Sequence, residues 1–323
     1  MRRFLSLIAV MLSVFCLTFA VACGGNEGDK QPVCAHDYQS TGEVGYFEQD
    51  KTAFSKEKKC TICQQYIEVP NSKVVSANDC YDAIAGAKDN EFLFLKRSDY
   101  TGVTLYTTAK NLYLCFEKGS KVSRIMSTAG TIENITIDGL SFEGNFTMPE
   151  QVNGITIKNC KFTENAQISN QNDALIKDLS LIGCEFIGIS SGGKLTAVRV
   201  NLCENLTVKD CIFNTIEYNA LQIGGNRLTG TVIITGNTFK GTGSSVIHLA
   251  NCHLTDCDIS GNVFYLKDTL SGSNYLNILD NASGIVKFGV NTWEVIPEAS
   301  EFYFEGISSG KVEYNMDEQL LLG

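Results

Sequence analysis

The sequence predicts an all-β solenoid, and three observations support this prediction. Seven similar segments recur along the chain, and their starts are separated by 20, 24, 27, 26, 25 and 29 residues. Apolar and polar residues alternate within each segment, as in a β-strand, and each segment ends in an aromatic residue. A period in the twenties is typical of stacked coils, because one coil cannot bury its apolar face alone. The segments are residues 135–142, 155–162, 179–186, 206–213, 232–239, 257–264 and 286–293.

Three columns of this alignment predict internal structure. The fifth column predicts a tight bend, because nearly all its residues tolerate a left-handed backbone. In the sixth column, stacked thiols would act as compact apolar groups and stacked Asn side chains would form a hydrogen-bonded ladder. The rings of the eighth column are expected to stack inside the coils. The fifth column is Gly139, Asn159, Gly183, Asp210, Gly236, Gly261 and Val290; the sixth is Leu140, Cys160, Cys184, Cys211, Asn237, Asn262 and Asn291; the eighth is Phe142, Phe162, Phe186, Phe213, Phe239, Phe264 and Trp293.

A second set of strands follows the aromatic residue in most repeats, with its second and fourth positions apolar and inward. Further strands extend the stack toward the N-terminus. Residues 78–88 begin with a capping residue and have helix-favouring spacing, so we expect a helix that covers the open end of the first coil. The second strands are residues 197–200, 220–223, 246–249, 275–278 and 301–304, and the earlier strands are 91–95, 103–105 and 112–116.

The repeat pattern resembles the right-handed parallel β-helix of the pectin-lyase-like superfamily, over about residues 75–315. The resemblance implies about nine coils within a body that spans residues 75–323. Leucine-rich repeats have a similar period, but their Leu-x-x-Leu-x-Leu spacing is missing. Members of the superfamily are mostly polysaccharide lyases and glycoside hydrolases, so the resemblance implies a carbohydrate-related function without fixing an activity.

The first residues predict export and a lipid anchor. Arg2 and Arg3 precede an apolar run, which is typical of a signal peptide over residues 1–22. Cys23 follows small residues, as in a bacterial lipobox, and the resemblance implies that it becomes lipidated. The alternatives are cleavage after Ala22 without a lipid and an uncleaved anchor. Residues 23–33 would then form a flexible tether that holds the body at the extracytoplasmic side of the membrane.

Residues 34–70 predict a small Cys/His module. Cys34 and His36 form one close pair of ligands, and Cys60 and Cys63 form another. Three thiolates and one imidazole can surround a tetrahedral zinc ion, and such a closed set would be structural. The segment resembles small Zn-ribbon-like modules on bacterial surface proteins. The alternative is a disulfide of Cys34 with Cys60 or Cys63, with His36 at the surface.

Charge excludes one class of partner. The chain of 323 residues carries 36 acidic and 26 basic side chains, a formal charge of −10, and has no basic run after Arg3. Nucleic acid is therefore not an expected partner, because phosphate binding needs clustered Lys and Arg.

The outward column of the second strands is the candidate ligand-binding face. Its five residues would form a row of donors with one aromatic ring, suited to a glycan or a partner protein, although they could also be ordinary solvated residues. They are Arg199, Gln222, His248, Asn277 and Tyr303. The outward columns of the first strands lack neighbouring carboxylates, which glycoside hydrolysis requires. If the protein is an enzyme, Arg199 or His248 is the candidate base, with Glu217 or Asp173 as a loop partner.

These observations favour a membrane-tethered surface lipoprotein whose β-helix presents a non-catalytic glycan- or protein-binding face. The alternative is a polysaccharide lyase or glycoside hydrolase of the same fold. A structural zinc ion is the one cofactor expected, and the membrane, through the lipid, is one expected partner.

Overall fold

A computed structural model describes residues 38–46, 53–60, 66–67, 72–126, 131–148, 151–170, 174–190, 192, 195–265, 276–279, 285–295, 302–305, 311–314 and 319–321. The chain divides into two compact units, Met1–Ser72 and Lys73–Gly323. This boundary lies close to the predicted start of the repeats at residue 75. Each unit is described by itself below.

The described part of the first unit is a small antiparallel sheet. Strand β1 (Tyr38–Tyr46) pairs with β2 (Ala53–Cys60), and β2 pairs with β3 (Tyr66–Ile67). The register places Tyr38 opposite Cys60.

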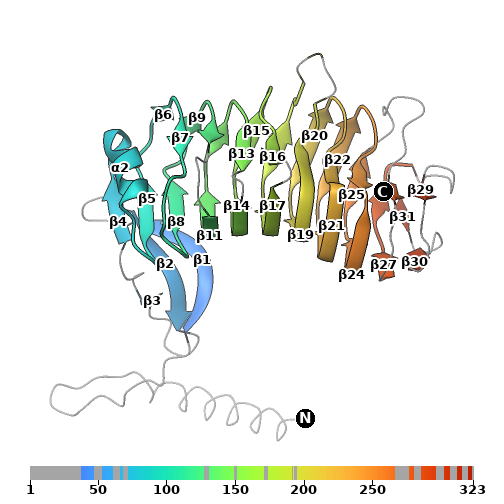
Figure 1. Ribbon diagram of the computed structural model, residues 1–323, viewed down its shortest axis with the longest axis horizontal. Helices are drawn as coiled ribbons and strands as arrows, with labels where there is room; N and C mark the ends of the chain where they lie inside the picture. Colours follow the sequence, from blue (N-terminus) through green and yellow to red (C-terminus); the bar gives the residue numbers. More distant parts are fainter. Residues whose placement is uncertain are drawn as a thin grey trace, which may run out of the picture. The chain divides into compact units, whose positions relative to one another are not determined.

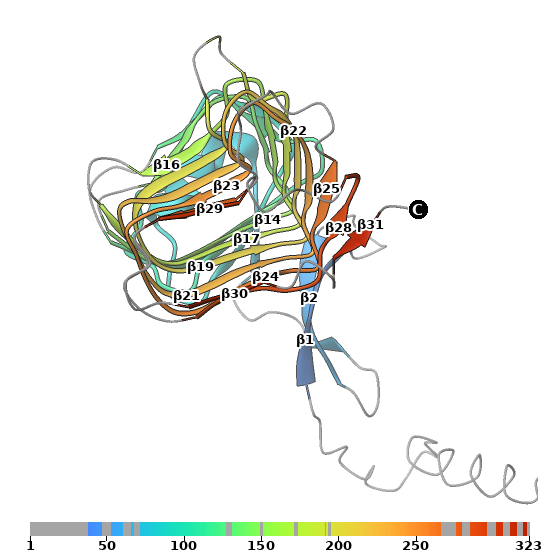
Figure 2. The same cartoon turned by 90° about the vertical axis from the view of Figure 1, so that its right-hand side faces the viewer.

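The second unit is an all-β parallel solenoid of right-handed type (Figure 1). Each turn contributes strands to three faces, which Figure 2 shows end-on. The first face contains β5 (Phe92–Leu95), β8 (Tyr113–Phe116), β11 (Thr131–Asp138), β14 (Gln151–Lys158), β17 (Leu175–Ile182), β19 (Val198–Lys209), β21 (Leu221–Thr235), β24 (Cys252–Ser260), β27 (Ile285–Phe288) and β30 (Lys311–Tyr314).

The second face is a sheet of ten short strands, which the sequence alignment did not separate from the first strands. It contains β6 (Asp99–Tyr100), β9 (Lys121–Val122), β12 (Ser141–Phe142), β15 (Lys161–Thr163), β18 (Glu185–Ile187), β20 (Ile212–Ile216), β22 (Thr238–Thr242), β25 (Val263–Tyr265), β28 (Thr292–Trp293) and β31 (Leu320–Leu321). The tight bend makes these residues a separate sheet, because the chain changes direction before the aromatic residue.

The third face corresponds to the second set of predicted strands. It contains β7 (Val103–Thr104), β10 (Ile125–Met126), β13 (Phe146–Met148), β16 (Ile168–Asn170), the first parts of β19 and β21, β23 (Ile247–Leu249), β26 (Leu276–Leu279) and β29 (Phe302–Glu305). The long strands β19 and β21 continue from the third face into the first face of the next turn.

The register confirms the sequence alignment residue by residue. The seven first positions are paired in sequence order, from Ile135 with Ile155 to Cys257 with Val286. The number of coils differs from the prediction, because the solenoid has about seven turns and not nine. The regular turns are the seven that carry the aromatic stack, whereas the earlier turns have Tyr100 and Val122 at the equivalent position.

The aromatic column forms a continuous stack along the core. Its rings, from Phe142 to Trp293, have centroids 4.2 to 5.1 Å apart and interplanar angles of at most 14°. All seven rings are fully or almost fully buried. Because each ring packs on the rings of both adjacent turns, the stack fixes the turns in register as well as burying apolar area.

The bend carries the predicted left-handed residues. Its backbone φ is positive from Gly139 to Gly261, and Asn159 and Asp210 adopt this conformation without being Gly. A second left-handed bend, which falls within β11, β17 and β19 at Asn134, Asp178 and Asn205, was missed. Its side chains form a ladder in which Asn134 donates to Asn111 and Asn205 donates to Asp178.

A short helix lies at the N-terminal end of the solenoid. A 3-10 helix, η1 (Ala77–Asp79), leads into α2 (Cys80–Ala85), which is shorter than the predicted residues 78–88. Strand β4 (Ser72–Val75) precedes them. Cys80 and Ile84 are buried in the core cluster, and α2 contacts β5 and β7. The helix therefore covers the first turn, as predicted.

Candidate functional site

The outward positions of the third face form a row along the solenoid axis, which we call the polar row. The strand register pairs Arg199 with Gln222, Gln222 with His248, His248 with Asn277, and Asn277 with Tyr303. Adjacent members are about 4.8 Å apart along the axis, the usual spacing of strands in a sheet. The structure thus brings the five predicted residues into one row; the side chain of Tyr303 lies outside the described part.

A second line of polar residues lies at the start of the same strands and was missed by the sequence analysis. We call it the buried polar line: Thr196, Asn219 and Ser245, which are only 3%, 3% and 5% exposed. Each precedes a member of the polar row by three residues, in a polar-apolar-apolar-polar pattern. This pattern in the sequence could have revealed the buried polar line. A search for strictly alternating apolar and polar residues misses the line, because the chain bends just before each strand begins.

Each described contact joins the buried polar line to the polar row of the next turn. Thr196 Oγ1 lies 3.4 Å from Gln222 Oε1 and donates to it. Asn277 Nδ2 donates to Ser245 Oγ over 2.6 Å and lies 3.4 Å from His248 Nδ1.

Two acceptors of this region lack partners. Asn219 Oδ1 and Asn277 Oδ1 are buried and accept no hydrogen bond within the described part of the chain. A buried amide oxygen without a donor costs about 1–3 kcal/mol relative to a satisfied one. Asn219 belongs to the turn before His248, three residues before its strand partner Gln222, and Asn277 is the strand partner of His248 in the turn after it.

Burial sets the charge state of this region. Desolvation lowers the pKa of His248, so its imidazole is neutral at neutral pH. Gln222 and Asn277 are half-buried, whereas Arg199 is exposed. The polar row therefore has a cationic, solvent-exposed start and a neutral, partly buried middle.

The candidates for acid-base chemistry are not brought together as a catalytic pair. Arg199 and His248 are separated by two turns, about 10 Å along the axis. The Glu217 carboxylate accepts a hydrogen bond from the backbone amide of Leu195 over 3.3 Å. Asp173 lies outside the described residues. This geometry supplies hydrogen-bonding groups along a line and does not define a base beside an acid.

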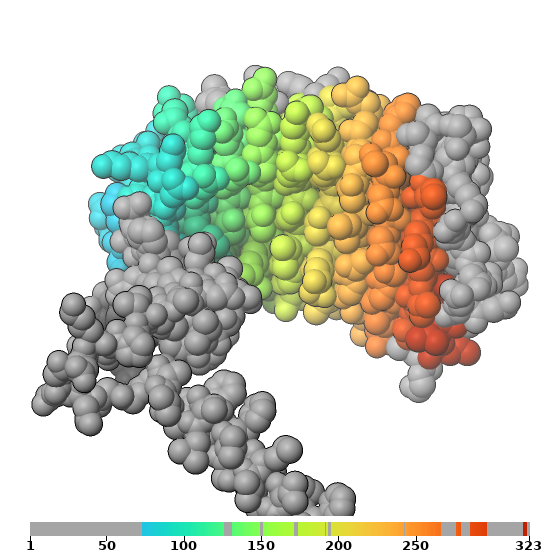
Figure 3. Space-filling model, turned by 90° about the horizontal axis from the view of Figure 1, so that it is seen from below, coloured from blue at the N-terminus to red at the C-terminus, as the bar shows by residue number. Residues whose placement is uncertain are grey.

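Charged side chains on the outer surface of the first face form local ion pairs. Lys110 pairs with Glu133, and Lys177 pairs with Glu204. Asp138 accepts hydrogen bonds from Tyr113 and Asn159. Figure 3 shows the turns of this side as a continuous surface of parallel ribs.

A cavity of about 250 Å³ lies beside the N-terminal helix. Its lining includes Asn78, Tyr81, Asp99 and Thr101, and the Tyr81 side chain is 56% exposed. The sequence analysis did not anticipate this cavity, because its walls come from α2 and from the bends around β6 and β7.

The predicted metal and lipid sites fall largely outside the described residues. Cys23, Cys34, His36 and Cys63 lie there, while Cys60 ends strand β2. The described residues contain no group of three or more His, Cys, Asp or Glu arranged to hold a metal ion. Among the helices that the structure describes, none is both long and apolar enough to cross a membrane.

Comparison with protein-family models, with curated proteins and with solved structures finds no match to this chain. The class of protein defined here is therefore a structural one, a parallel β-solenoid with a polar row on its third face.

Proposed function

We propose that this protein is a membrane-tethered extracytoplasmic lipoprotein whose solenoid binds glycan, without catalysis, along the polar row. The observation that carries the proposal is the register, which lines up Arg199, Gln222, His248 and Asn277 on successive turns. A line of hydrogen-bonding groups that repeats with each strand suits a chain ligand with hydroxyls along its length. A partner protein is the other ligand of this class.

The three-faced parallel solenoid and its aromatic stack support a place in the pectin-lyase-like superfamily. The competing function is that of a polysaccharide lyase or glycoside hydrolase with Arg199 or His248 as the base. The neutral state of His248 favours this alternative. The polar row itself contains no carboxylate, which favours binding.

Binding and cleavage are tested together on a panel of neutral and uronate-containing polysaccharides. We expect calorimetric binding that weakens at least tenfold in Arg199→Ala or Gln222→Ala, and no new reducing ends or unsaturated products. Arg227→Ala is the matched control, because Arg227 is also exposed but lies off the polar row. Product release from any substrate would replace the binding proposal with the enzymatic one.

Anchoring through Cys23 is a separate part of the proposal. We expect metabolic labelling with palmitate to modify the wild-type protein and to be lost in Cys23→Ala, with the variant released from the membrane fraction. Retention of the label in the variant would contradict lipidation at this residue.

A structural zinc site in residues 34–70 is also proposed. The pairing of Tyr38 with Cys60 supports it, because His36 and Cys34 precede Tyr38 by two and four residues. Cys63 lies between β2 and β3, close in sequence to Cys60. These four residues would hold the ion with three thiolates and one imidazole, and the ion would stabilise the small sheet. One zinc per chain, lost in Cys60→Ser with Cys63→Ser, is expected by elemental analysis.

A further inference from the structure

The cavity beside the N-terminal helix is not used by the proposed function. Its volume is about 250 Å³, and its walls come from the start of α2 and from the residues around β6 and β7. Pockets for drug-sized ligands usually measure about 300–1,000 Å³. This cavity is therefore large enough for one small ring, but too small for a longer stretch of a chain ligand.

The cavity lies in line with the polar row. The strand register continues the row beyond Arg199, toward the N-terminus, through four further outward positions of the third face. They are Ser169, Thr147, Met126 and Thr104. Thr104 lines the cavity, and it lies four strand spacings, about 19 Å, from Arg199. A chain ligand on the polar row that extends past Arg199 therefore reaches the cavity.

The polar side chains of the cavity are accessible to a ligand. Asn78, Asp99 and Thr101 are exposed, and none of these side chains makes a hydrogen bond within the described part of the chain. Among the described residues that line the cavity, only Asp99 is charged. Lys121, its strand partner, forms an ion pair with Glu143 instead. The Asp99 carboxylate accepts hydrogen bonds from hydroxyl groups and repels anions.

One aromatic ring is exposed at the cavity, and the thiol beside it is unreactive. The Tyr81 side chain is 56% exposed, so its ring is available to pack against the apolar face of a sugar ring. Burial raises the pKa of the Cys80 thiol to about 11, which keeps it protonated at neutral pH. The Tyr100 hydroxyl donates to Lys96 O. These groups suit reversible binding and not covalent chemistry.

We propose that this cavity binds the terminal, uncharged sugar residue of a glycan whose chain lies along the third face. The hydroxyls of that residue donate to Asp99 and exchange hydrogen bonds with Asn78 and Thr101, while its apolar face packs against Tyr81. A chain that enters past Thr104 meets α2, so the residue in the cavity is the end of the chain. This inference rests on the proposed glycan-binding function and specifies which part of the glycan is recognised.

Two substitutions at exposed lining positions test the cavity in the full mature chain. We expect Tyr81→Ala to weaken calorimetric binding of two neutral probes, mannohexaose and maltohexaose, at least tenfold. Asp99→Lys should weaken it similarly and strengthen binding of hexagalacturonate, an acidic oligosaccharide, because the charge at the cavity is reversed. Tyr106→Ala is the matched control, since Tyr106 is 51% exposed and does not line the cavity. Melting temperatures should stay unchanged, because all three side chains are exposed.

The number of protein molecules bound per glycan chain tests recognition of the chain end. On linear mannan or amylose, we expect saturation at no more than one protein per chain end, whatever the length of the chain. A bound number that rises with chain length would overturn the assignment of the cavity to a terminal residue.

The remaining outcomes separate the cavity from the glycan-binding function. Unchanged binding of the neutral probes in either cavity variant, or an equal loss in Tyr106→Ala, would overturn the cavity proposal. Binding of any glycan, neutral or acidic, that needs Arg199 but neither Tyr81 nor Asp99 would uphold the glycan-binding function and overturn the cavity proposal. If the wild-type protein binds none of these oligosaccharides and no polysaccharide of the panel, the glycan-binding function fails and the cavity proposal fails with it.

Discussion

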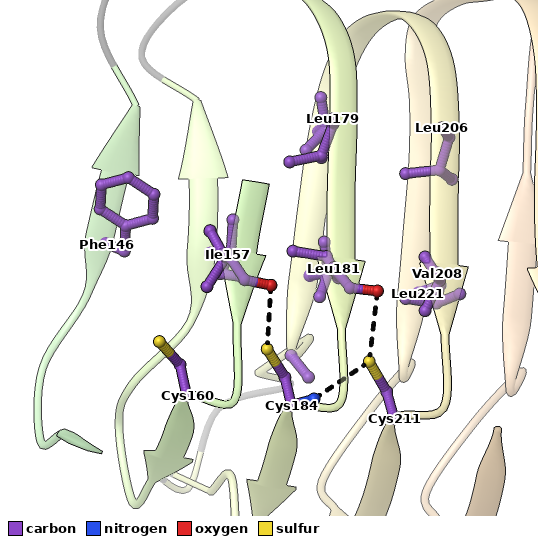
Figure 4. Packing of buried hydrophobic residues seen from close by; sticks show 14 of the residues in the cluster. Phe146, Ile157, Cys160, Leu179, Leu181, Cys184, Leu206, Val208, Cys211 and Leu221 are labelled. Carbon is purple, nitrogen blue, oxygen red and sulfur yellow. Dashed lines mark hydrogen bonds between the residues drawn. The ribbon is translucent and has the colours of Figure 1, made fainter. Parts of the chain in front are cut away.

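The two halves of the solenoid fill the same buried position with different kinds of side chain. At the inward position after the bend, the turns around Cys160, Cys184 and Cys211 carry thiols, whereas the next three turns carry Asn237, Asn262 and Asn291. Both sets are fully buried. Figure 4 shows the thiol column, in which Cys184 Sγ approaches Ile157 O and Cys211 Sγ approaches Leu181 O.

The quality of the hydrogen bonds differs between the halves. The amide of Cys184 meets Cys211 Sγ at 3.4 Å, while the amide of Asn237 meets Asn262 Oδ1 at 3.0 Å. Sulfur is a weak acceptor and a weak donor, whereas a carboxamide accepts and donates at full strength. The thiol half therefore relies more on packing, and the amide half relies on a connected polar ladder.

Both ends of the amide ladder have hydrogen-bond partners. Gln319 Oε1 accepts from the Asn291 backbone amide over 3.1 Å and from Trp293 Nε1 over 3.0 Å. At the other end, Asn237 Oδ1 accepts from the backbone amide of Cys211 over 2.9 Å. The ladder is thus satisfied at both ends, which is the condition under which a buried polar network stabilises a fold.

The largest effect is expected from breaking the amide ladder at its middle. Asn262→Leu removes the acceptor for Asn237 and the donor to Ile234 O, and leaves these buried groups unpaired. We expect a loss of about 4 kcal/mol in the free energy of unfolding, measured with urea. A loss below about 1 kcal/mol would show that the ladder is not the main source of stability in this half.

A smaller effect is expected in the thiol half. Cys184→Ala removes a buried sulfur and two weak sulfur-to-carbonyl contacts, and should cost about 1–2 kcal/mol. The same urea titration measures it beside Asn262→Leu. An equal loss in both variants would remove the proposed difference between the halves.

A single substitution in the thiol half should extend the amide ladder by one turn. In Cys211→Asn, the new carboxamide would lie next to Asn237 and could donate to Leu181 O, the acceptor that the Cys211 thiol now uses. We expect a change within about 1 kcal/mol, because new hydrogen bonds offset the larger side chain. Cys160→Asn, which lies three turns from Asn237, is the control and should be more destabilising.

Alkaline pH should affect the thiols and not the amides. Burial raises the pKa of Cys203 to about 12. The hydrogen bond with Cys160, and then burial, raise the pKa of Cys184 well above its ordinary value of 9.0. The native state then holds protons that the unfolded state releases, so stability is constant below pH 9 and falls as pH rises above it. The fall in urea midpoint above pH 9 should be smaller in Cys184→Ala than in the wild type.

The smallest expected effect concerns the polar row. Because burial lowers the pKa of His248, the unfolded state binds the proton more tightly than the native state. Stability is therefore complete above pH 6.5 and declines as pH falls below that value. His248→Gln should flatten this decline in urea midpoints, and an unchanged decline in this variant would contradict the assignment to His248.

The alignment of repeats was a reliable guide to register, but it was less reliable for the number of faces. The pairing of Ile135 with Ile155 and of Gln222 with His248 could be read from the alternation of apolar residues. The second face could not, because its strands, such as Ser141–Phe142, are too short to show a period. The predicted number of coils was too high, because the solenoid has about seven turns where about nine were expected.

The repeats in the sequence were enough to predict the solenoid, the bend, the ring stack and the order of the polar row, because every turn offers the same inward positions to the next turn. The burial of individual polar residues, and the satisfaction of their hydrogen-bonding atoms, became known from the folded structure alone. Asn219 and Asn262 look alike in the sequence, yet one oxygen lacks a donor and the other accepts from Asn237. Satisfaction of a buried group depends on neighbours one turn away, which the local sequence does not specify.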